Sequence, residues 1–231
     1  MTALWKNDQE FFAIARREAF TAVVGDAMDK MGLRRQFLPP QIQPLDRTLV
    51  LVGRAMPVLE ADYFDESTAG SHNPVSSRPF GLMLEALDGL CPNEVYVCTG
   101  ASPSYALWGE LMSTRAIRCG AAGAVVDGYS RDSRGVLALG FPTFSYGGYA
   151  QDQGPRGKVV DYRIPIQIGQ ARIEPGDIIF GDLDGVCVVP AKAEADVFSA
   201  AIKKVRGEKT VRKALEQGMT AVEAFERYGI L

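Results

Sequence analysis

Residues 108–132, WGELMSTRAIRCGAAGAVVDGYSRD, carry most of the side chains that could do chemistry. Glu110 follows Gly109 at the start of a predicted helix, where free backbone amides and the positive end of the helix dipole attract a small anion. Arg131 offers a planar guanidinium that can hold a carboxylate with two hydrogen bonds, and Asp132 offers the oxygen ligand that hard divalent cations prefer. Together these residues predict a carboxylate pocket beside a cation site.

Each half of this segment also has a simpler interpretation. Glu110 alone could just complement the dipole of its helix, as acids in a first turn often do. An adjacent Arg131–Asp132 pair could be a surface ion pair or a helix cap. The site interpretation is favoured because GAVV at residues 123–126 predicts a strand, and a helix start and a strand end separated by one helix and one strand are neighbours in a β-α-β unit.

The chain has one histidine, so the sequence argues against chemistry that depends on a histidine cluster or a Ser-His-Asp triad. His72 lies in the polar run SHNPVSSRP and is interpreted as a loop residue. The four cysteines, Cys91, Cys98, Cys119 and Cys187, form no C-x-x-C pair, which favours reduced thiols over a disulfide framework or a zinc site.

Other sequence patterns are weaker or absent. The chain contains no G-x-G-x-x-G, Walker A or G-x-S-x-G motif, so nucleotide-binding and serine-hydrolase functions lose their usual support. The GDLDG run with Asp182 and Asp184 lacks the remaining ligands of a calcium loop and predicts a turn between strands. The charged run RGEKTVRK is most simply a solvated helix face.

The 231 residues are 47% hydrophobic and 23% charged, which is typical of a chain that buries a full core. The net charge of −3 leaves no cationic excess, so nucleic acid is not an expected partner. No run approaches the roughly 20 apolar residues of a membrane helix, and the opening MTALWKNDQE has no apolar signal-peptide core. We therefore expect a cytoplasmic protein with no membrane association.

The pattern of elements predicts an α/β fold. Two short helices open the chain over about residues 8–32, with Asp8 as the first cap, and a long strand covers residues 47–61. A polar excursion at residues 62–79 precedes an alternation of helices and strands that indicates parallel pairing. From Phe141 onward, short strands separated by Gly, Pro and Asp predict hairpins and a small antiparallel or barrel-like sheet. Helices cover about residues 191–228, with a break near Gly218.

Four blocks in order, WGELMSTRA, CGAAGAVVDGYSRD, FPTFSYG and PGDIIFGDLDGVCVVP, resemble the RraA-like family. This family includes 4-hydroxy-4-methyl-2-oxoglutarate aldolases and the regulator of ribonuclease E activity A. The resemblance implies a single domain over residues 1–231, with the terminal helices as extensions. It also implies a layered α/β/α fold of the swivelling β/β/α type, with a mixed sheet, assembled as trimers or hexamers with active sites between subunits.

The resemblance also implies roles for individual residues. Arg131 would grip the pyruvate moiety, Asp132 would bind Mg²⁺ or Mn²⁺ directly, and Glu110 would reach the metal through water. The backbone of Leu111 and Met112, with Gly109 before them, would bind the substrate. A glutamate from the C-terminal helix of the neighbouring subunit aligns with Glu208, although Glu216 is also permitted by the helical spacing.

The implied reaction is cleavage of a 4-hydroxy-2-oxo acid, or decarboxylation of oxaloacetate, to give pyruvate enolate. No lysine stands out for a Schiff base, so a metal ion would stabilise the enolate, and a chain with one histidine favours Mg²⁺ or Mn²⁺ over zinc. The competing function is a protein-binding regulator of ribonuclease E, which needs no complete metal site. The presence of Arg131, Asp132 and Glu110 favours the enzyme, and residues 62–79 are expected to shape its substrate preference.

Overall fold

The protein is described here from a computed structural model, which covers residues 4–63 and 72–229. The chain divides into two compact units, one formed by residues 1–34 and 192–231 and the other by residues 35–191. The prediction of one domain with helical extensions stays a prediction, and each unit is described by itself.

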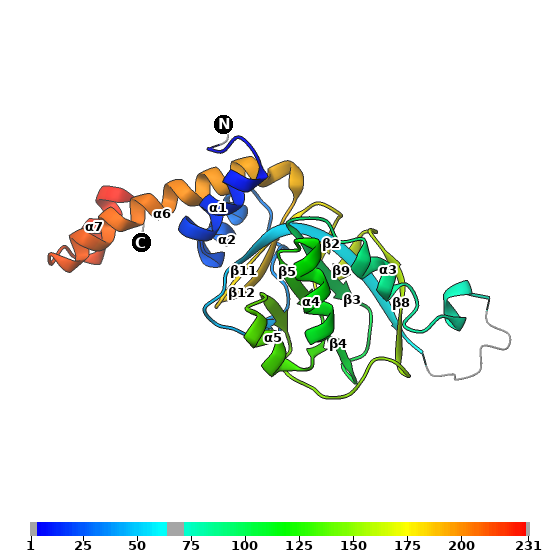
Figure 1. Cartoon of the computed structure of the whole chain (residues 1–231). Coiled ribbons are helices and arrows are strands. Elements are labelled where there is room, and N and C mark those ends of the chain that lie inside the picture. The colour runs from blue at the N-terminus through cyan, green and yellow to red at the C-terminus, as the bar shows by residue number, and fades with distance from the viewer. Residues whose placement is uncertain (1–3, 64–71, 230–231) are drawn as a thin grey trace. The chain divides into compact units, whose positions relative to one another are not determined.

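The larger unit is built on an eight-stranded mixed sheet with the order β1-β7-β5-β3-β2-β11-β12, and β8 pairs with β2 (Figure 1). Its strands are β1 (Gln43–Pro44), β2 (Leu51–Asp62), β3 (Glu94–Thr99), β5 (Gly123–Val126), β7 (Thr143–Ser145), β8 (Gly157–Tyr162), β11 (Ile178–Asp182) and β12 (Gly185–Val189). Neighbours from β2 through β3 and β5 to β7 run parallel, and the remaining pairs of this sheet are antiparallel.

Alternation of side chains along the central strands creates two separate cores. On β3, Tyr96 and Cys98 face one core, whereas Val95 and Val97 face the other, as the period of two along a strand requires. The first core is covered by α3 (Met83–Asp88) and α4 (Glu110–Cys119). The second core is covered by the hairpin of β9 (Ile166–Ile168) and β10 (Ala171–Ile173). A helical layer, a mixed sheet and a small antiparallel layer confirm the predicted α/β class.

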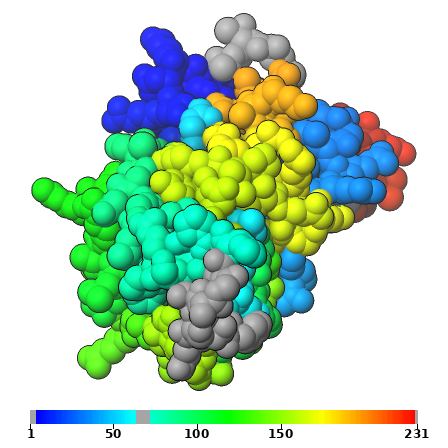
Figure 2. All heavy atoms as spheres, turned by 90° about the vertical axis from the view of Figure 1, so that its right-hand side faces the viewer, coloured from blue at the N-terminus to red at the C-terminus, as the bar shows by residue number. Residues whose placement is uncertain are grey.

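The remaining elements of this unit are the short helices η1 (Pro74–Ser77) and α5 (Ser133–Leu139) and the paired strands β4 (Ala106–Trp108) and β6 (Tyr129–Ser130). The short helix η2 (Ala191–Ala193) begins at the last residue of this unit. In Figure 2, the cyan-green segment that contains α3 lies beside the yellow-green segment that contains β8. A backbone bridge between Gly81 and Val159 joins these two segments.

Two local predictions from the sequence are corrected. The strand in FPTFSYGG was grouped with the antiparallel part, but β7 pairs in parallel with β5, so the parallel layer extends one strand further. Asp8 was expected to cap the first helix, but Asn7 is the cap, because its Oδ1 accepts a hydrogen bond of 2.9 Å from the Glu10 amide.

The smaller unit consists of α1 (Asp8–Glu18), α2 (Thr21–Lys30), α6 (Glu194–Glu216) and α7 (Ala221–Tyr228). Phe11 of α1 packs edge-on against Phe198 of α6, with ring centroids 4.8 Å apart. The guanidinium of Arg206 on α6 lies 2.9 Å from the Glu18 carboxylate, and this hydrogen bond, helped by Arg17, lowers the pKa of Glu18 to about 2. The break between α6 and α7 falls near Gly218, as predicted, and the φ of 95° at this glycine lies in the left-handed region.

None of the helices in residues 4–63 and 72–229 is long and apolar enough to cross a membrane.

Candidate active site

A short parallel pairing brings the two halves of the segment at residues 108–132 together. Strand β4 pairs with β6 so that Trp108 lies opposite Ser130, and the Arg131 amide donates a hydrogen bond of 2.8 Å to the Trp108 carbonyl. Gly109 and Arg131 each follow one of these strands directly. The expected meeting of a helix start and a strand end therefore occurs, at β4 and β6 rather than at β5 alone.

The start of α4 is left open toward this junction. Gly109 is the N-cap of α4 and has no side chain with which to bond the amides of the first turn. Two hydrogen bonds stabilise the junction between β4 and α4. Trp108 Nε1 donates to Ser113 Oγ at 2.7 Å, and Ser113 Oγ donates to the Gly109 carbonyl at 3.0 Å. Leu111 and Met112 in the first turn both border the adjoining cavity, and the binding of substrate by their backbone amides stays a prediction.

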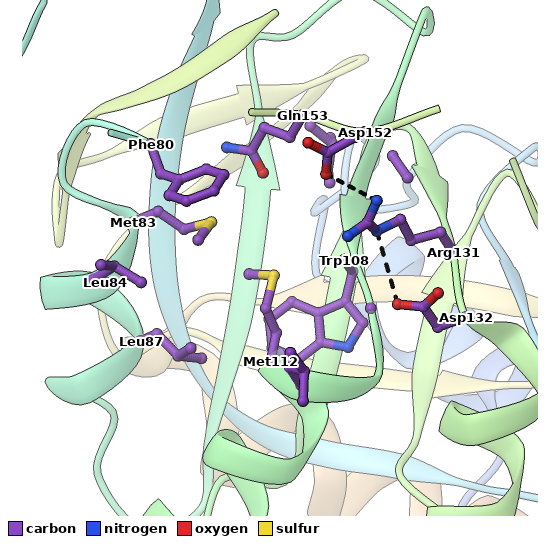
Figure 3. Close-up of a pocket in the computed structure, with 14 residues that line it drawn as sticks. Phe80, Met83, Leu84, Leu87, Trp108, Met112, Arg131, Asp132, Asp152 and Gln153 are labelled. Carbon is purple, nitrogen blue, oxygen red and sulfur yellow. Dashed lines mark ion pairs between the residues drawn. The ribbon is translucent and has the colours of Figure 1, made fainter. Parts of the chain in front are cut away.

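Arg131 lies between two carboxylates in this cavity (Figure 3). Its Nη1 is 2.8 Å from Asp152 Oδ1, and its Nε is 3.7 Å from Asp132 Oδ2. Both acids are about half exposed and the Arg131 side chain is 39% exposed, so solvent reaches all three groups. The guanidinium is therefore accessible to an incoming carboxylate, with Asp152 as its present partner.

Asp132 has a backbone conformation that ordinary residues rarely adopt. Its φ of 53° and ψ of 33° lie in the left-handed region, at the N-cap of α5. A Cβ at Gly109 would come within 3.0 Å of Asp132 Oδ2, so the glycine leaves room for this carboxylate against the start of α4. The local backbone thus directs Asp132 toward Gly109 and Arg131.

Glu110 and Asp132 border a shared hollow beside α5, together with Ser133, Arg134, Gly135 and Ala138. A Cβ at Gly135 would overlap the Glu110 carboxylate, so this glycine also makes space for an acid. Residues 4–63 and 72–229 contain no cluster of three or more His, Cys, Asp or Glu side chains able to hold a metal. Two carboxylates at one hollow nevertheless fit Mg²⁺ or Mn²⁺, which are commonly held by one or two carboxylates with water and substrate completing the shell.

The main cavity measures about 280 Å³ and borders the same residues. Figure 3 shows Arg131, Asp132 and Asp152 on one side of this cavity and Phe80, Met83, Leu84 and Leu87 on the opposite side, with Trp108 and Met112 between them. Gly109, Leu111 and Gln153 also line the cavity. Five of the six predicted site residues of this unit line the main cavity, and Glu110 lines the adjacent hollow.

Glu208 lies on α6 in the smaller unit, where its Oε1 is 3.6 Å from Lys204 Nζ. Lys204 also pairs with Asp26 of α2. The role of Glu208 at the metal of a neighbouring subunit stays a prediction. His72 is exposed and outside helices and strands, as expected of a loop residue. Part of the segment at residues 62–79, which was expected to shape substrate preference, lies outside the described residues.

Sequence reasoning missed Asp152, which no local pattern marks. The loop that carries it is held against both short strands, because the Tyr149 amide donates to the Ser130 carbonyl at 2.8 Å and the Ala106 amide donates to the Gln151 carbonyl at 2.9 Å. These contacts, between residues 19 and 45 positions apart in the sequence, bring Asp152 to Arg131.

Asp127 has a supporting role between β5 and β6. Its Oδ2 accepts a hydrogen bond from Thr99 Oγ1 and its Oδ1 accepts one from the Tyr146 hydroxyl, both at 2.7 Å. Burial and the bond to Asp127 raise the pKa of Tyr146 to about 12, so Tyr146 stays protonated and remains a donor. This network ties the loop before β6 to the ends of β3 and β7.

Comparisons with known proteins agree with the earlier resemblance. A protein of Halalkalibacterium halodurans, named provisionally as a 4-hydroxy-4-methyl-2-oxoglutarate aldolase, is 31% identical over 206 residues, which cover 89% of each chain. A crystal structure of an uncharacterized Pseudomonas syringae protein aligns with a TM-score of 0.77 and 25% identity, covering 97% of this chain and 99% of that one. Streptomyces coelicolor RraAS2, described as an unusual member of the RNase ES inhibitor RraA family, aligns with a TM-score of 0.74 and 25% identity, covering 90% and 98%.

The family model for RraA-like proteins, described as Aldolase/RraA, matches residues 21–188, which include β4, β6, α4 and every candidate site residue of the larger unit. With most of its length matched, this chain belongs to the RraA-like family.

Proposed function

We propose that this chain is a divalent-metal-dependent lyase that cleaves 4-hydroxy-2-oxo acids, of the type of 4-hydroxy-4-methyl-2-oxoglutarate, to pyruvate and a second carbonyl compound. Decarboxylation of oxaloacetate is the expected side activity. The observation that carries the proposal is that the Arg131 guanidinium, the Asp132 carboxylate and the open first turn of α4 border one cavity. The aldolase name of the Halalkalibacterium relative supports the same reaction class.

In this reaction the bond between C3 and C4 breaks, and its electron pair stays on C3 as pyruvate enolate. The C4 hydroxyl loses its proton and becomes the carbonyl of the second product, and a proton added at C3 gives pyruvate. A Mg²⁺ or Mn²⁺ ion held at Asp132 would supply the positive charge that stabilises the enolate. The same enolate forms when oxaloacetate loses carbon dioxide.

The chain's own residues bind and orient the substrate. Arg131 holds the C1 carboxylate with charge-assisted hydrogen bonds, and the amides of Leu111 and Met112 donate to the same end of the substrate. Glu110, across the hollow from Asp132, is the proposed holder of the proton that leaves the C4 hydroxyl. Glu208 of a neighbouring subunit is proposed to assist it.

The decisive experiment follows pyruvate release from a panel of 4-hydroxy-2-oxo acids and oxaloacetate, with and without Mg²⁺. We expect pyruvate release in the presence of Mg²⁺, and we expect both a chelator and the variant Asp132→Ala to abolish it. The thermal unfolding of Asp132→Ala should stay close to that of the wild type. Titration with Mn²⁺, followed by electron paramagnetic resonance, should show binding to the wild type and weakened binding to Asp132→Ala. Full activity of Asp132→Ala, or activity in chelator, would contradict the proposal.

A second function is favoured by one relative, RraAS2, whose description places it among ribonuclease inhibitors. In that case the chain binds ribonuclease E and slows the cleavage of RNA by that enzyme. A binding titration with purified ribonuclease E separates the two functions, because Asp132→Ala should abolish the lyase reaction and leave such binding unchanged.

A further inference from the structure

The side-chain amide of Gln153 is buried at the main cavity without a hydrogen-bond partner. Gln153 lies in the loop between β7 and β8, lines the cavity and is 5% exposed. Its Nε2 is shielded from solvent and meets no acceptor among residues 4–63 and 72–229. Most buried polar groups in proteins are paired, because leaving such a donor unpaired costs free energy. An unpaired donor at a cavity therefore indicates an acceptor on a ligand.

The position of Gln153 is set by the turn that carries it. The Gln153 carbonyl accepts hydrogen bonds from the amide of Arg156 at 2.7 Å and from the amide of Gly157 at 2.9 Å. Arg156 Nη1 also donates to the Asp152 carbonyl at 2.9 Å. These bonds close a tight turn, so the fold determines where the Gln153 side chain leaves the backbone.

Gln153 and Asp132 lie apart at the cavity. Arg131 lies between Asp132 and Asp152, and Figure 3 shows Gln153 on the far side of Asp152, toward Phe80. In the proposed reaction, Arg131 holds the C1 carboxylate and the metal lies at Asp132. The other end of the substrate can then extend toward Gln153.

A neutral amide suits a carboxylate at this place. Both oxygens of the neighbouring Asp152 are engaged, because Oδ1 pairs with Arg131 and Oδ2 accepts from the Gly154 amide at 3.0 Å. A glutamine amide has two N–H donors and one acceptor oxygen, and a half-turn about its last bond exchanges them. Gln153 can therefore present a donor to a ligand oxygen, and a hydrogen bond to a charged oxygen is stronger than one to a neutral oxygen.

We infer that Gln153 is a specificity-determining residue, whose amide donates a hydrogen bond to the second carboxylate, on C4, of a 4-hydroxy-2-oxo dicarboxylic acid. This inference rests on the proposed lyase function and names the residue that selects its substrate class. It concerns one donor of the site, so it holds together with any groups that a neighbouring subunit adds. The bond between C3 and C4 still breaks with its electron pair on C3, and the carboxylate held by Gln153 leaves with the second product.

The test compares two substrates that differ only in the group on C4. The first, 4-hydroxy-2-oxoglutarate, carries a carboxylate there and gives pyruvate and glyoxylate. The second, 4-hydroxy-2-oxopentanoate, carries a methyl group and gives pyruvate and acetaldehyde. We expect Gln153→Met to lower the ratio of kcat/KM for the first substrate to that for the second by about tenfold or more, because methionine keeps the length of the side chain but has no donor. Most of this loss should come from a higher KM for the dicarboxylate.

The control is Gln43→Met, which should keep the wild-type ratio. Gln43 is exposed, donates to the Pro40 carbonyl at 2.9 Å and does not line the cavity. An unchanged ratio in folded Gln153→Met would overturn the inference and leave the lyase proposal intact. An equal loss of kcat/KM for both substrates would also contradict it, because the amide would then contact a part that the two substrates share.

Stability and assembly separate a ligand contact from a structural role of Gln153. Because Gln153→Met removes an unpaired buried polar group, we expect it to unfold at the same temperature as the wild type or at a higher one. A lower unfolding temperature with an unchanged substrate ratio would assign the amide to the packing of its loop. Loss of an oligomer in light scattering, again with an unchanged ratio, would assign it to a subunit interface. Either result would reject the inference.

A binding measurement distinguishes failure of this inference from failure of the proposed function. If neither substrate is cleaved, the lyase proposal fails, and calorimetric titration with 2-oxoglutarate and with 2-oxopentanoate then tests Gln153 alone. Gln153→Glu keeps the shape of the side chain but replaces the donor with a charged acceptor. It should lower the affinity for 2-oxoglutarate relative to 2-oxopentanoate by about tenfold or more. The same relative affinity in the wild type and in Gln153→Glu would refute the contact.

Discussion

The guanidinium of Arg131 and the carboxylate of Asp152 form an ion pair, with 2.8 Å between Nη1 and Oδ1. Asp152 thus occupies a place on Arg131 that a substrate carboxylate would compete for. Because Asp152 is 46% exposed, the pair is screened by solvent and can be opened at modest cost.

Asp152→Asn should tighten the binding of pyruvate and other 2-oxo acids. The amide keeps the shape of the side chain and the oxygen that accepts from the Gly154 amide, but it removes the charge that neutralises Arg131. A solvent-exposed pair is worth roughly 0.2 to 1 kcal/mol, so we expect a gain in affinity of up to about fivefold at low salt. Calorimetric titration with pyruvate measures it.

The control for this variant is Asp88→Asn, which removes another exposed acid, paired with Arg115 at 2.7 Å and outside the cavity lining. It should leave pyruvate affinity unchanged. Weaker binding in Asp152→Asn would show instead that Asp152 positions the guanidinium for substrate.

Arg131→Lys should lower kcat/KM for the 2-oxo acid by about 10- to 100-fold, which corresponds to the 1.5 to 3 kcal/mol of a hydrogen bond to a charged group. Lysine keeps the charge but cannot offer two parallel donors to one carboxylate. Steady-state pyruvate release measures the loss. The control is Arg172→Lys, because Arg172 on β10 forms an exposed ion pair with Glu174. A near-native kcat/KM for Arg131→Lys would indicate that Arg131 forms only a surface ion pair.

Gly135→Ala should lower lyase activity without lowering stability. The added methyl group overlaps the Glu110 carboxylate and displaces it from the hollow that it shares with Asp132. Within α5 the same change favours the helix by up to about 1 kcal/mol. Thermal unfolding together with pyruvate release tests both halves of this prediction.

The double variant Gly135→Ala, Glu110→Asp should recover part of the activity, since the aspartate side chain is one methylene shorter and avoids the methyl group. Wild-type activity in Gly135→Ala would argue that the position of Glu110 is unimportant for the reaction.

The central strands and helices that support this site can be predicted from the sequence, but the short strands that bring its residues together cannot. The apolar runs of β3 and β5, with the helix between them, predict parallel strands because local periodicity is strong there. Strands β4 and β6 have three and two residues, which is too short for any periodic pattern, although their pairing sets Gly109 beside Arg131. The left-handed backbone of Asp132 and its contact with Gly109 likewise follow from tertiary packing.

Long-range contacts also hide Asp152 and Glu60 from sequence analysis. Asp152 reaches Arg131 through a loop fixed by β4 and β6, and its sequence neighbours resemble any polar turn. Glu60 belongs to the apolar run of β2, where strand alternation alone would place a charged residue near solvent, yet it is 2% exposed. A register shift between Leu59 and Glu60 alters that alternation.

Glu60→Gln should stabilise the protein above neutral pH. Burial, with the nearby charge of Asp62, raises the pKa of Glu60 from 4.5 to about 8. Its Oε2 accepts a long contact of 3.8 Å from Cys98 Sγ, and its Oε1 has no hydrogen-bond partner among the described residues. The nearby hydroxyl of Tyr105 and the thiol of Cys98 lower the pKa of Glu60, but by less than burial raises it. The titratable groups around it are Asp62, Cys98, Tyr96 and Tyr105, none of which is a cation.

Between pH 4.5 and about 8 the folded state holds a proton on Glu60 that the unfolded state has lost. The free energy of unfolding contributed by Glu60 therefore falls as pH rises through this window. Each unit of pKa difference is worth about 1.4 kcal/mol, so Glu60→Gln should gain a few kcal/mol over wild type at pH 8.5 and little at pH 4.5. Urea denaturation at both pH values measures this, with exposed Glu174→Gln as the control, and a pH-independent difference would contradict the buried-proton explanation.

The last prediction concerns assembly, because the proposed site takes Glu208 from a neighbouring subunit of a trimer or hexamer. Glu208 lies on α6 of the smaller unit, and Asp132 lies in the larger one. If Glu208 acts in trans, then Glu208→Gln and Asp132→Ala subunits are each inactive alone, but a mixed oligomer contains interfaces that join an intact Asp132 to an intact Glu208. Mixing the two variants should restore a measurable fraction of pyruvate release. Light scattering that shows a fully active monomer would refute the shared site. A confirmed oligomer with verified subunit exchange and no restored activity would instead reject Glu208. Glu216, about two helical turns further along α6, would then be the residue to test next.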